Sequence, residues 1–541
     1  MSDAPARHRL MAAGTEPDNA GDRLAATARE AFGWESLRPG QREVMEAVLA
    51  GRDALAVMPT GWGKSALYQL PALLIDGPTV VVSPLKALQH DQAGALRAHG
   101  RRAGGAVQVN SDTGAQERGQ AFASVRRGRT EFLFLSPEQL EKPEVLEQVA
   151  RAGPSLFVVD EAHCISSWGH DFRPAYLHLA DAADAIGRPA VLALTATASP
   201  PVREDIVVRL RLRDPVVAVR GFDRPNLELA VEQYPDDASK REAVLERAAG
   251  LAKPGIVYTA TRRSAEQYAD QLAALGLRAA AFHGSLPQAQ RHRVHEEFLA
   301  DRLDVVVATS AFGMGVDKPN VRFVLHADVP ESPDAYWQEV GRAGRDGEPA
   351  TAILFYRPED LGLRRFFTGG LPDLDDLQAV AAARAEHPDA TRKSLADAAG
   401  MGPRKFGRLL NLLEDAGDPS AARALAEQQQ RVERSRLEMM RGYAETRDCR
   451  RRFLFGYFGE PADDPCERCD RCHEGTAHEV RDRAADGAPF GVGERVEHDE
   501  LGEGTVMALE KGRVVVLFAE QGYATLSLDV VRRRDLLHSA D

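Results

Sequence analysis

A glycine-rich stretch between two apolar segments, AVMPTGWGKS at residues 56–65, carries the residue types that bind phosphate. It follows a short apolar run that reads as a strand and precedes ALYQLPALL, which reads as a helix. In that order, glycines let backbone N–H groups turn toward phosphate oxygens, and the helix N-terminus adds the positive end of its dipole. We therefore predict a nucleotide-binding loop. Its residues are Thr60, Gly61, Trp62, Gly63, Lys64 and Ser65.

Within this loop, Lys64 can reach the β- and γ-phosphates of a nucleoside triphosphate, and the Ser65 hydroxyl can ligate Mg²⁺. The usual pattern has glycine at the position of Met58. Because of that departure, an ordinary glycine-rich turn between a strand and a helix stays open as the alternative for the loop taken alone.

Two adjacent carboxylates, Asp160 and Glu161, follow the apolar run LFVV. A carboxylate at the end of a strand can hold Mg²⁺ directly or through water. Its neighbour can orient and deprotonate an attacking water molecule. The alternative is that both acids only stabilise a helix N-terminus. Alongside Lys64 and Ser65 they complete a minimum set for nucleoside triphosphate hydrolysis, which is the interpretation we prefer.

Two arginines lie far along the chain in SPDAYWQEVGRAGRDGEPATAILFY, at residues 332–356. If residues 334–340 are helical, Arg342 and Arg345 emerge at the glycine-rich end of that helix and face the phosphate loop across a cleft. Gln338 lies on the same predicted helix. An arginine from a second lobe stabilises charge on the γ-phosphate only when the lobes close. A basic turn exposed to solvent is the alternative.

An aromatic ring, a guanidinium and an amide stand just upstream of the loop, in Trp34, Arg38 and Gln41. Side chains of these types can stack on an adenine ring and read its edge. A corner between two packed helices, with polar groups facing solvent, remains the alternative.

Short apolar strands and helices must position these residues. Strands that end in turns are expected within 79–88, 131–140, 155–164 and 190–199, and helices such as 115–127 lie between them. Strands joined by helices imply a parallel sheet with functional groups at the carboxyl ends of the strands. A second unit of the same kind begins near residue 221.

The chain resembles superfamily 2 helicase motors in its motifs GWGKS, DEAH and TAT. It resembles the RecQ DNA helicases more closely in FGWESLRPGQ, SPLKALQHDQ and CISSWGHDFRPAYLHL. The resemblance covers about residues 22–370 and 431–475. It implies two RecA-like lobes and an ATP- and Mg²⁺-dependent enzyme. Such an enzyme would move 3′→5′ on single-stranded DNA and unwind duplexes in repair or recombination.

By this resemblance, one loop senses single-stranded DNA and couples it to ATP hydrolysis. Its residues are Trp168, His170, Phe172 and Arg173. Aromatic side chains stack on bases with about 1–3 kcal/mol each, and arginine adds phosphate contacts. An aromatic-rich core loop is the alternative.

The resemblance also implies roles elsewhere in the motor. Arg345 would be the arginine finger and Arg342 would couple the lobes, although geometry cannot separate the two from sequence. Gly315 and Asp317 would link the nucleotide cleft to the DNA. Three residues at strand ends would touch DNA phosphates, namely Ser83, Ser136 and Thr309. Such contacts position a strand without reading its sequence.

After the motor, residues 371–420 read as three short helices whose last two are tightly joined, which resembles a helix-turn-helix or winged-helix core. Arg404, Lys405 and Arg408 lie near the start of the third helix. Contact with duplex DNA and a structural bundle with a solvated basic face both stay open. The helical stretch that follows carries eight arginines against four acidic residues between 431 and 452. That excess suits a DNA-facing side in an acidic protein.

Four of the five cysteines cluster near the C-terminus, at Cys449, Cys466, Cys469 and Cys472. They form a four-thiolate set with no open position, which predicts a structural Zn²⁺ site that contributes folding energy. The pattern CRRxxLxxYFGE followed by CxxCDxC also resembles the RecQ zinc module. Reduced free thiols are the alternative.

Residues 489–541 read as short alternating strands separated by glycine turns, which favours a small SH3-like β-barrel. A protein-contact module and a passive capping domain are both consistent with it. The predicted fold class is α/β, with two RecA-like parallel-sheet motor domains, a winged-helix-like element, a zinc-binding module and the barrel. The predicted boundaries are 1–21 (disordered tail), 22–218 and 219–370 (motor domains), 371–420 (helical element), 421–475 (helical hairpin and zinc module) and 476–488 (linker).

The 541 residues carry a net charge of −13 and contain no apolar run of the ~18–20 residues that a membrane span needs. The N-terminus lacks the apolar core of a signal peptide. We expect a cytoplasmic monomer, nucleoid-associated in a bacterium, that binds single-stranded and tailed duplex DNA through a local basic groove. A protein partner would bind through the barrel.

Two other classes of function stay open. One is an RNA-directed DExH ATPase, against which the loop around Trp168 and the cysteine set both argue. The other is a DNA-stimulated translocase that does not separate strands. RecQ helicases typically use a hairpin beyond the zinc module as a wedge, and residues after 475 show no evident counterpart.

Overall fold

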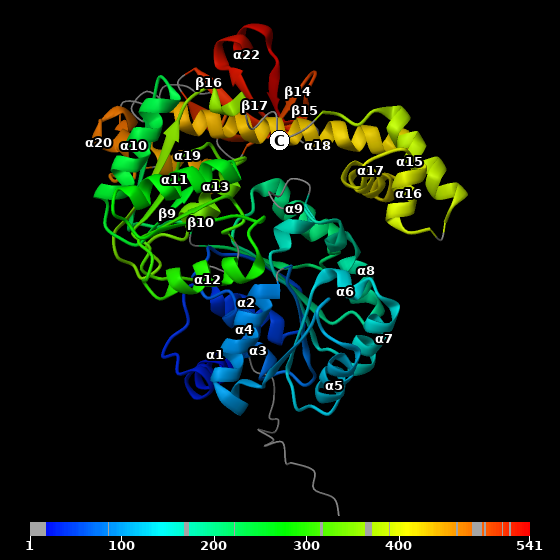
Figure 1. Ribbon diagram of the computed structural model, residues 1–541. Helices are drawn as coiled ribbons and strands as arrows, with labels where there is room; N and C mark the ends of the chain where they lie inside the picture. The colour runs from blue at the N-terminus through cyan, green and yellow to red at the C-terminus, as the bar shows by residue number, and fades with distance from the viewer. Residues whose placement is uncertain are drawn as a thin grey trace, which may run out of the picture.

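Figure 1 shows a computed structural model of the chain, in which two lobes lie below a long helix that carries a helical projection at one end. The structure describes residues 18–84, 86–166, 172–220, 222–313, 317–362, 370–388, 390–460, 462, 464–478, 490–491, 494–510, 512–518 and 521–540. Three predicted site residues, Trp168, His170 and Gly315, lie outside these ranges.

The first lobe is built on a seven-stranded sheet in which every neighbouring pair is parallel. Its strands, in spatial order, are β3 (Ala106–Val109), β4 (Phe132–Leu135), β2 (Thr79–Val82), β5 (Leu156–Val159), β6 (Ala190–Thr195), β1 (Ala54–Val57) and β7 (Val216–Val219). The parallel sheet and the four predicted strands are confirmed. The outer strands β3 and β7 were not predicted, and only one residue of β7 is buried.

Helices connect these strands. They are α1 (Asp18–Thr27), the π-helix η1 (Ala28–Phe32), α2 (Gln41–Leu49), α3 (Ala66–Ala72), α4 (Lys86–Ala98), η2 (Gly100–Ala103), α5 (Ala115–Arg126), α6 (Pro137–Leu140), α7 (Pro143–Ala152), η3 (Ala162–Ile165), η4 (Pro174–His178), α8 (Leu179–Ala185) and α9 (Pro200–Arg209). Side chains alternate between two apolar cores along β1, with Leu55 and Val57 in one and Ala54 and Ala56 in the other. Burial on both faces explains why the strands read as continuous apolar runs.

The second lobe contains a six-stranded parallel sheet. Its strands, in spatial order, are β10 (Ala279–Phe282), β11 (Val305–Ala308), β9 (Gly255–Tyr258), β12 (Phe323–His326), β13 (Ala350–Tyr356) and β8 (Leu227–Gln233). Its helices are α10 (Asp237–Gly250), α11 (Arg262–Ala274), α12 (Gln288–Leu299) and α13 (Pro333–Val340). Ser332 caps α13 by accepting a hydrogen bond from the Ala335 N–H, and Pro333 occupies the first turn, so the sequence itself fixes where this helix begins.

After the second lobe, the described residues continue with the helices α15 (Leu374–Glu386), α16 (Arg392–Ala398), α17 (Pro403–Ala416) and α18 (Pro419–Glu445). We call α15, α16, α17 and the first half of α18 the arm, which projects to the right in Figure 1. The arm has its own apolar core around Phe406, Leu409 and Leu413. Among the described residues of this segment there is no strand that could form a wing, so the structure shows a helical bundle.

The long helix α18 runs from the arm to the second lobe and leads into the cysteine cluster through α19 (Arg450–Tyr457) and α20 (Asp470–His473). At the C-terminus lies a five-stranded antiparallel sheet in the order β17 (Gly522–Ser527), β16 (Arg513–Phe518), β15 (Gly502–Glu510), β14 (Arg495–His498) and β18 (Leu537–Ser539), with α22 (Leu528–Arg534) before the last strand. The structure thus establishes a small antiparallel sheet.

None of the helices in the described parts of the chain is long and apolar enough to cross a membrane.

Candidate active site

The predicted phosphate loop leads from β1 into α3, and residues upstream of it hold its shape. Gly61 and Gly63 both have φ of +81°, in the left-handed region that favours glycine. Arg38 Nη1 donates to the Gly61 carbonyl at 2.6 Å. Gln41 Nε2 donates to the carbonyls of Trp62 at 3.0 Å and Gly63 at 3.2 Å. These bonds engage the loop carbonyls, and the Trp62 N–H donates to the Pro59 carbonyl at 3.1 Å.

Met58, which replaces the glycine of the usual pattern, continues the strand direction of β1. Its N–H donates to the Thr195 carbonyl at 3.0 Å, and its side chain is fully buried in the apolar core of the lobe. Its carbonyl accepts a hydrogen bond from Lys64 Nζ at 3.1 Å. Because Met58 does not take a left-handed conformation, glycine is not needed at this position.

The two carboxylates lie directly after β5 and close to Lys64. Asp160 is only 5% exposed, and its side chain accepts hydrogen bonds from the Glu161 N–H at 3.0 Å and from Gln92 Nε2 at 3.4 Å. Burial, together with the neighbouring Glu161 carboxylate, raises the pKa of Asp160 to about 7, and the Lys64 ammonium opposes the shift. A nearby cation stabilises the charged form of a carboxylate that is buried in this way.

Glu161 has φ of +50°, which is unusual for a residue with a side chain. The turn places its Oε2 3.4 Å from His163 Nδ1. His163 Nδ1 also lies 2.9 Å from Thr195 Oγ1, whose own proton goes to the Thr197 carbonyl at 2.9 Å. Nδ1 must therefore be the protonated nitrogen. This network joins the carboxylates to the end of β6.

Lys64 lies in a site where burial lowers the pKa of its ammonium, and Asp160 and Glu161 oppose that effect. Arg345 of the second lobe lowers the same pKa further, which places its positive charge near the phosphate loop. The two lobes therefore contribute cations to one pocket.

Arg345 crosses from the second lobe to the loop. A Cβ added to Gly61 would lie 3.5 Å from Arg345 Cδ. The side chain is only 5% exposed, and its Nη1 lies 2.8 Å from Asp317 Oδ1. Burial, with help from the nearby Arg342, lowers the pKa of Arg345 to about 10, so the guanidinium stays charged at neutral pH.

Arg342 lies deeper in the second lobe than Arg345. It is buried, and its Nη2 lies 3.5 Å from the position of a Cβ added to Gly313. Gln338 is half-buried on α13. The structure thus separates the two arginines that the sequence left equivalent, because only Arg345 lies against the phosphate loop.

Of the three predicted adenine-reading residues, Arg38 and Gln41 hydrogen-bond to the loop, whereas Trp34 stacks on a neighbouring ring. Trp34 stacks on Phe32 with ring centroids 4.5 Å apart and an angle of 15°. The Arg38 guanidinium lies over the Trp62 ring at 5.5 Å. The polar side chains of this segment therefore hold the loop, while Trp34 packs against the adjacent core.

The three residues predicted to touch DNA phosphates differ in how exposed they are to solvent. Ser83 is 0% exposed at the end of β2, and its N–H donates to the Leu135 carbonyl at 3.0 Å. Ser136 is also buried, at the N-terminus of α6. Thr309 is half-buried after β11.

Phe172 and Arg173 are the two described residues of the predicted DNA-sensing loop, and both are half-buried. Arg173 Nη1 donates to the Pro84 carbonyl at 3.1 Å, and its N–H donates to the Cys164 carbonyl at 2.8 Å. The loop is therefore tied at this end to the segments that follow β2 and β5, and the second of these carries the two carboxylates.

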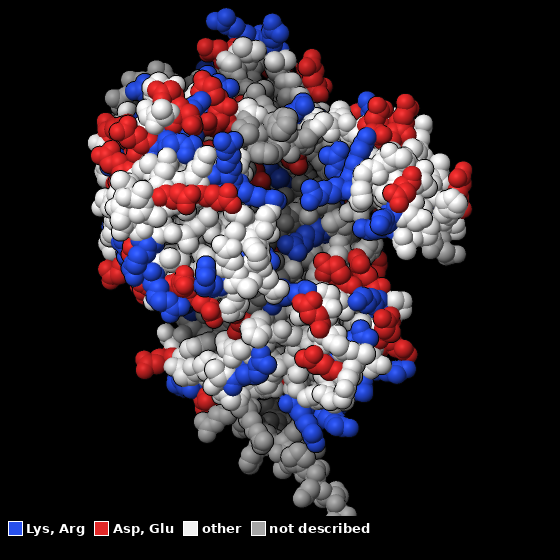
Figure 2. All heavy atoms as spheres, viewed as in Figure 1, with Lys and Arg blue, Asp and Glu red and all other residues white. Residues whose placement is uncertain are grey.

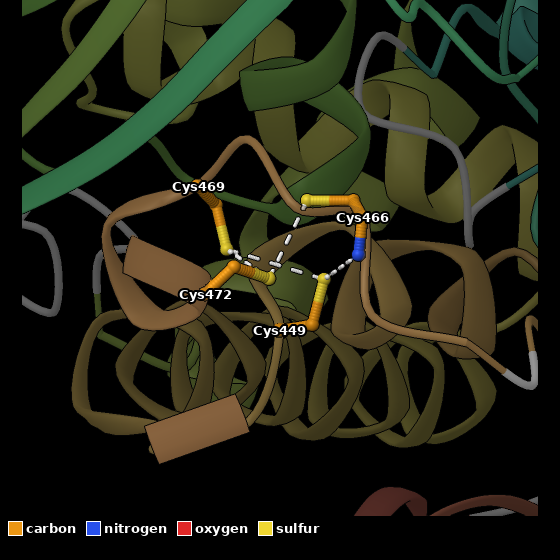
Figure 3. A group of neighbouring side chains, drawn as sticks. All are labelled: Cys449, Cys466, Cys469 and Cys472. Atoms are coloured by element: carbon orange, nitrogen blue, oxygen red, sulfur yellow. Dashed lines mark hydrogen bonds between the residues drawn. The ribbon is translucent and has the colours of Figure 1, made fainter. Parts of the chain in front are cut away.

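The four predicted cysteine ligands converge in a single cluster, as Figure 3 shows. Their Sγ atoms lie within 4.8 Å of one another, with Cys469 3.5 Å from Cys472 and 4.0 Å from Cys449. A tetrahedral Zn²⁺ with four sulfur ligands has sulfur–sulfur edges of about 3.8 Å. The N–H groups of Arg450 and Cys466 donate to Sγ of Cys469 and Cys449 at 3.4 and 3.3 Å. The cluster has the chemistry and spacing of a structural zinc site.

Arginines beside the cysteines attach this module to the second lobe. Arg450 is fully buried and pairs with Asp470 at 2.9 Å, and Asp470 also accepts the Val231 N–H at 3.0 Å. Arg451 donates to Asp223 at 2.7 Å and to the Arg224 carbonyl at 2.8 Å. The cluster therefore stabilises a module that is bonded to β8 and its approach.

The same module also reaches the first lobe and the C-terminal sheet. Arg203 of α9 donates to the Phe458 carbonyl. Tyr457 donates to Asp334 of α13 and stacks on Tyr523 of β17, with ring centroids 4.9 Å apart. Four parts of the chain meet at this point.

Two parallel-sheet lobes, a phosphate cradle with paired carboxylates on the first and an arginine from the second define the class of superfamily 2 helicase motors. Residues 38–206 match the family of DEAD/DEAH box helicases, 240–347 match the helicase conserved C-terminal domain, and 406–473 match the RecQ zinc-binding family. The chain belongs to the RecQ family of DNA helicases.

Named relatives support this placement. The chain is 43% identical over 343 residues to the probable ATP-dependent DNA helicase RecS of Bacillus subtilis, covering 63% of this chain and 68% of that protein. It is 37% identical over 445 residues to the ATP-dependent DNA helicase RecQ of Haemophilus influenzae, covering 82% of this chain and 62% of that protein. It is 35% identical over 452 residues to RecQ of Bacillus subtilis, covering 83% and 67%. The chain thus spans 62–68% of the length of these three relatives.

Solved structures agree at the level of the fold. The Mycobacterium smegmatis helicase Lhr, bound to ssDNA and AMP-PNP, matches with a TM-score of 0.53 at 21% identity over 93% of this chain and 78% of that one. S. cerevisiae Dbp5, bound to RNA and ADP BeF3, matches with a TM-score of 0.51 at 18% identity over 65% of this chain and 93% of that one. At such identities the likeness shows the fold alone.

Proposed function

We propose that this chain is an ATP- and Mg²⁺-dependent DNA helicase that moves 3′→5′ on single-stranded DNA and unwinds tailed duplexes in repair or recombination. The observation that carries the proposal is the contact of Arg345 with Gly61, because it makes the hydrolytic site depend on both lobes. Family membership supplies the substrate class, and the relatives named above are ATP-dependent DNA helicases.

The residues around the loop suggest a separate role for each side chain in ATP hydrolysis. The N–H groups of residues 60–65 and the Lys64 ammonium would bind the β- and γ-phosphates. Ser65 and Asp160 would hold Mg²⁺, which neutralises phosphate charge during in-line attack. Glu161 would accept the proton of the attacking water, oriented by His163. Arg345 would stabilise charge on the γ-phosphate, and Gln338 and Arg342 would sense closure of the lobes.

Closing and opening of the lobes would move the DNA strand. On the first lobe, the DNA-sensing loop would place Trp168, His170 and Phe172 for stacking, with Arg173 joining that loop to Pro84. On the second lobe, Thr309 would touch a phosphate. Gly315 and Asp317 would transmit the state of the nucleotide, since Asp317 is the partner of Arg345.

Several finer features belong to the same proposal. The C-terminal sheet would be an SH3-like barrel that binds a protein partner, and α15–α17 would be a helix-turn-helix element. The domain boundaries given above, a monomeric state and a place at the nucleoid are also proposed.

A DNA-stimulated translocase without strand separation is the second candidate. The observation that favours it is that, in the described residues after the cysteine cluster, all strands belong to the C-terminal sheet. A separate wedge hairpin is therefore not seen there. This candidate shares the ATPase site and differs only in its product.

The decisive experiment measures strand displacement on 3′-tailed, 5′-tailed and blunt duplexes, alongside ATPase activity with DNA or RNA. We expect displacement of the 3′-tailed DNA and stimulation of ATPase by single-stranded DNA. Glu161→Gln is the control and should abolish displacement while ATP still binds. Stimulation without displacement would select the translocase, and stimulation by RNA alone would overturn the DNA assignment.

A further inference from the structure

The outward face of α17 is the feature of this molecule that the motor does not explain. The inward face of α17 carries the buried side chains Phe406, Leu409, Leu410 and Leu413. On an α-helix the opposite stripe is then formed by Arg404, Arg408, Asn411 and Asp415, at spacings of four, three and four residues. This stripe begins with two cations and ends with a carboxylate.

The two arginines of this stripe are exposed. In the described portion of the chain neither Arg404 nor Arg408 forms an ion pair, whereas the neighbouring Lys405 pairs with Asp376 at 2.6 Å. Two guanidinium groups one helical turn apart on an acidic protein give a concentrated positive charge that no ion pair among the described residues neutralises.

The C-terminal half of this stripe lines a hollow beside the first lobe. Asn411 and Asp415 line a cavity of about 1440 Å³ together with Phe172, Arg173 and His178 of that lobe. Figure 2 shows Lys and Arg side chains along the inner edge of the arm, beside the hollow that separates it from the lobes. The C-terminal half of α17 therefore lines the same cavity as Phe172 and Arg173, the described end of the predicted DNA-sensing loop.

The charges of the surrounding side chains determine which part of the outward face of α17 can bind DNA. The cavity itself is also lined by Glu138, Glu141, Glu414 and Asp415. Arg384 and Arg392 line it too, but Glu414 lies 3.4 and 3.9 Å from them. Phosphates are repelled from such a wall, so DNA is favoured only at the N-terminal half of α17, around Arg404 and Arg408.

The amino-acid composition of the arm favours duplex DNA over single-stranded DNA as its ligand. Single-stranded binders rely on aromatic side chains that stack on bases. The arm, residues 371–430, contains one Phe, Tyr or Trp, namely Phe406, and it is 1% exposed. It can hold DNA only through charge and hydrogen bonds. A third helix that offers arginines from its first turns is the arrangement by which helix-turn-helix proteins meet a duplex.

We propose that the arm is a duplex-DNA clamp in which Arg404 and Arg408 bind the phosphates of the duplex next to the single strand held by the motor. This inference rests on the proposed function, because it assumes that the motor engages a tailed duplex. It makes α17 a second DNA contact, separate from the ATPase site and from the loop around Arg173.

The test compares binding of a 3′-tailed duplex with binding of its single-stranded tail alone, by fluorescence anisotropy without ATP and at several salt concentrations. In Arg404→Ala/Arg408→Ala we expect affinity for the tailed duplex to fall about tenfold or more and the salt slope to decrease by about 2. Affinity for the single strand and ATPase stimulated by it should change less than about twofold, since the variant lies outside that site.

Two control variants sharpen the result. Arg404→Lys/Arg408→Lys keeps both charges and should retain most of the duplex affinity. Arg126→Ala/Arg127→Ala removes two exposed arginines at the end of α5 and should leave duplex binding unchanged. An unchanged circular dichroism spectrum shows that α17 is still folded.

Unchanged duplex affinity in Arg404→Ala/Arg408→Ala would overturn the clamp. An equal loss for duplex and single strand would overturn it as well, because the arm would then bind single strands. Failure of the helicase proposal itself is distinguishable, since it would appear as absent DNA-stimulated ATPase in the unmodified protein.

Discussion

The stem of Arg345 lies against Gly61, with Cδ 3.5 Å from the point that a Cβ on Gly61 would occupy, although the two residues belong to different lobes. Gly61 has φ of +81°, and its lack of a side chain lets the arginine approach the loop backbone. A nucleotide bound at this loop would meet the guanidinium directly. Under the proposed function, closure of the lobes would therefore complete the hydrolytic site.

We expect Arg345→Ala to lower kcat for ATP hydrolysis by about 10³-fold, because a trans-acting arginine contributes that much in related phosphoryl transfer. The KM for ATP should change far less, since the loop and Lys64 remain. Arg342→Ala, matched in charge, should have the smaller effect on single-turnover hydrolysis. An Arg342 variant as damaged in this step as the Arg345 variant would contradict the structural distinction between them.

Gln41→Ala should raise the KM for ATP about tenfold or more. Each of the two hydrogen bonds from its amide to the loop carbonyls contributes about 0.5–1.5 kcal/mol, and their loss lets the loop relax. Gln41→Glu should be at least as harmful, because it keeps the acceptor for the Arg38 N–H and loses both donors. Glu43→Ala, an exposed change on the same helix, serves as the control in steady-state kinetics.

Cys469→Ser should remove Zn²⁺ and lower the melting temperature, because a four-thiolate site contributes to folding when the metal binds. Metal content per chain, measured by mass spectrometry, should fall from about one toward zero. Cys164→Ser is the matched control, since that cysteine lies in the first lobe apart from the cluster, and it should keep its metal. Full metal content in the Cys469 variant would refute the site.

Tyr523→Ala should loosen the C-terminal sheet from the motor. The ring is buried and stacks on Tyr457, and truncating a buried aromatic costs about 3–5 kcal/mol. Hydrogen exchange should show faster exchange in β17 and α19 for this variant. Tyr523→Phe keeps the stacked ring and should exchange almost as slowly as the unmodified protein. Equal protection in all three proteins would show that the stacking contributes nothing to docking.

Much of the candidate site could be predicted because its chemistry lies in short contiguous motifs. The loop at 56–65, the carboxylates after β5 and the cysteine cluster each combine residue type with local spacing, and local spacing survives without a fold. The paired lobes followed from apolar runs that alternate with helical patterns. His163 and Thr195 were part of recognised motifs, but their hydrogen bond joins residues 32 positions apart and no sequence period marks it.

The sequence by itself determined the family, the two parallel-sheet lobes, the nucleotide loop and the four thiolate ligands, because each depends on side chains that are neighbours along the chain. Only the tertiary structure decided that Arg345 and not Arg342 meets the loop, that Arg38 and Gln41 bond to its carbonyls, and that the Ser83 hydroxyl is buried. It also decided that the C-terminal half of α17, with Asn411 and Asp415, lines the hollow beside the first lobe. These outcomes depend on which distant segments pack together, and packing is set by surfaces that exist only once the chain has folded.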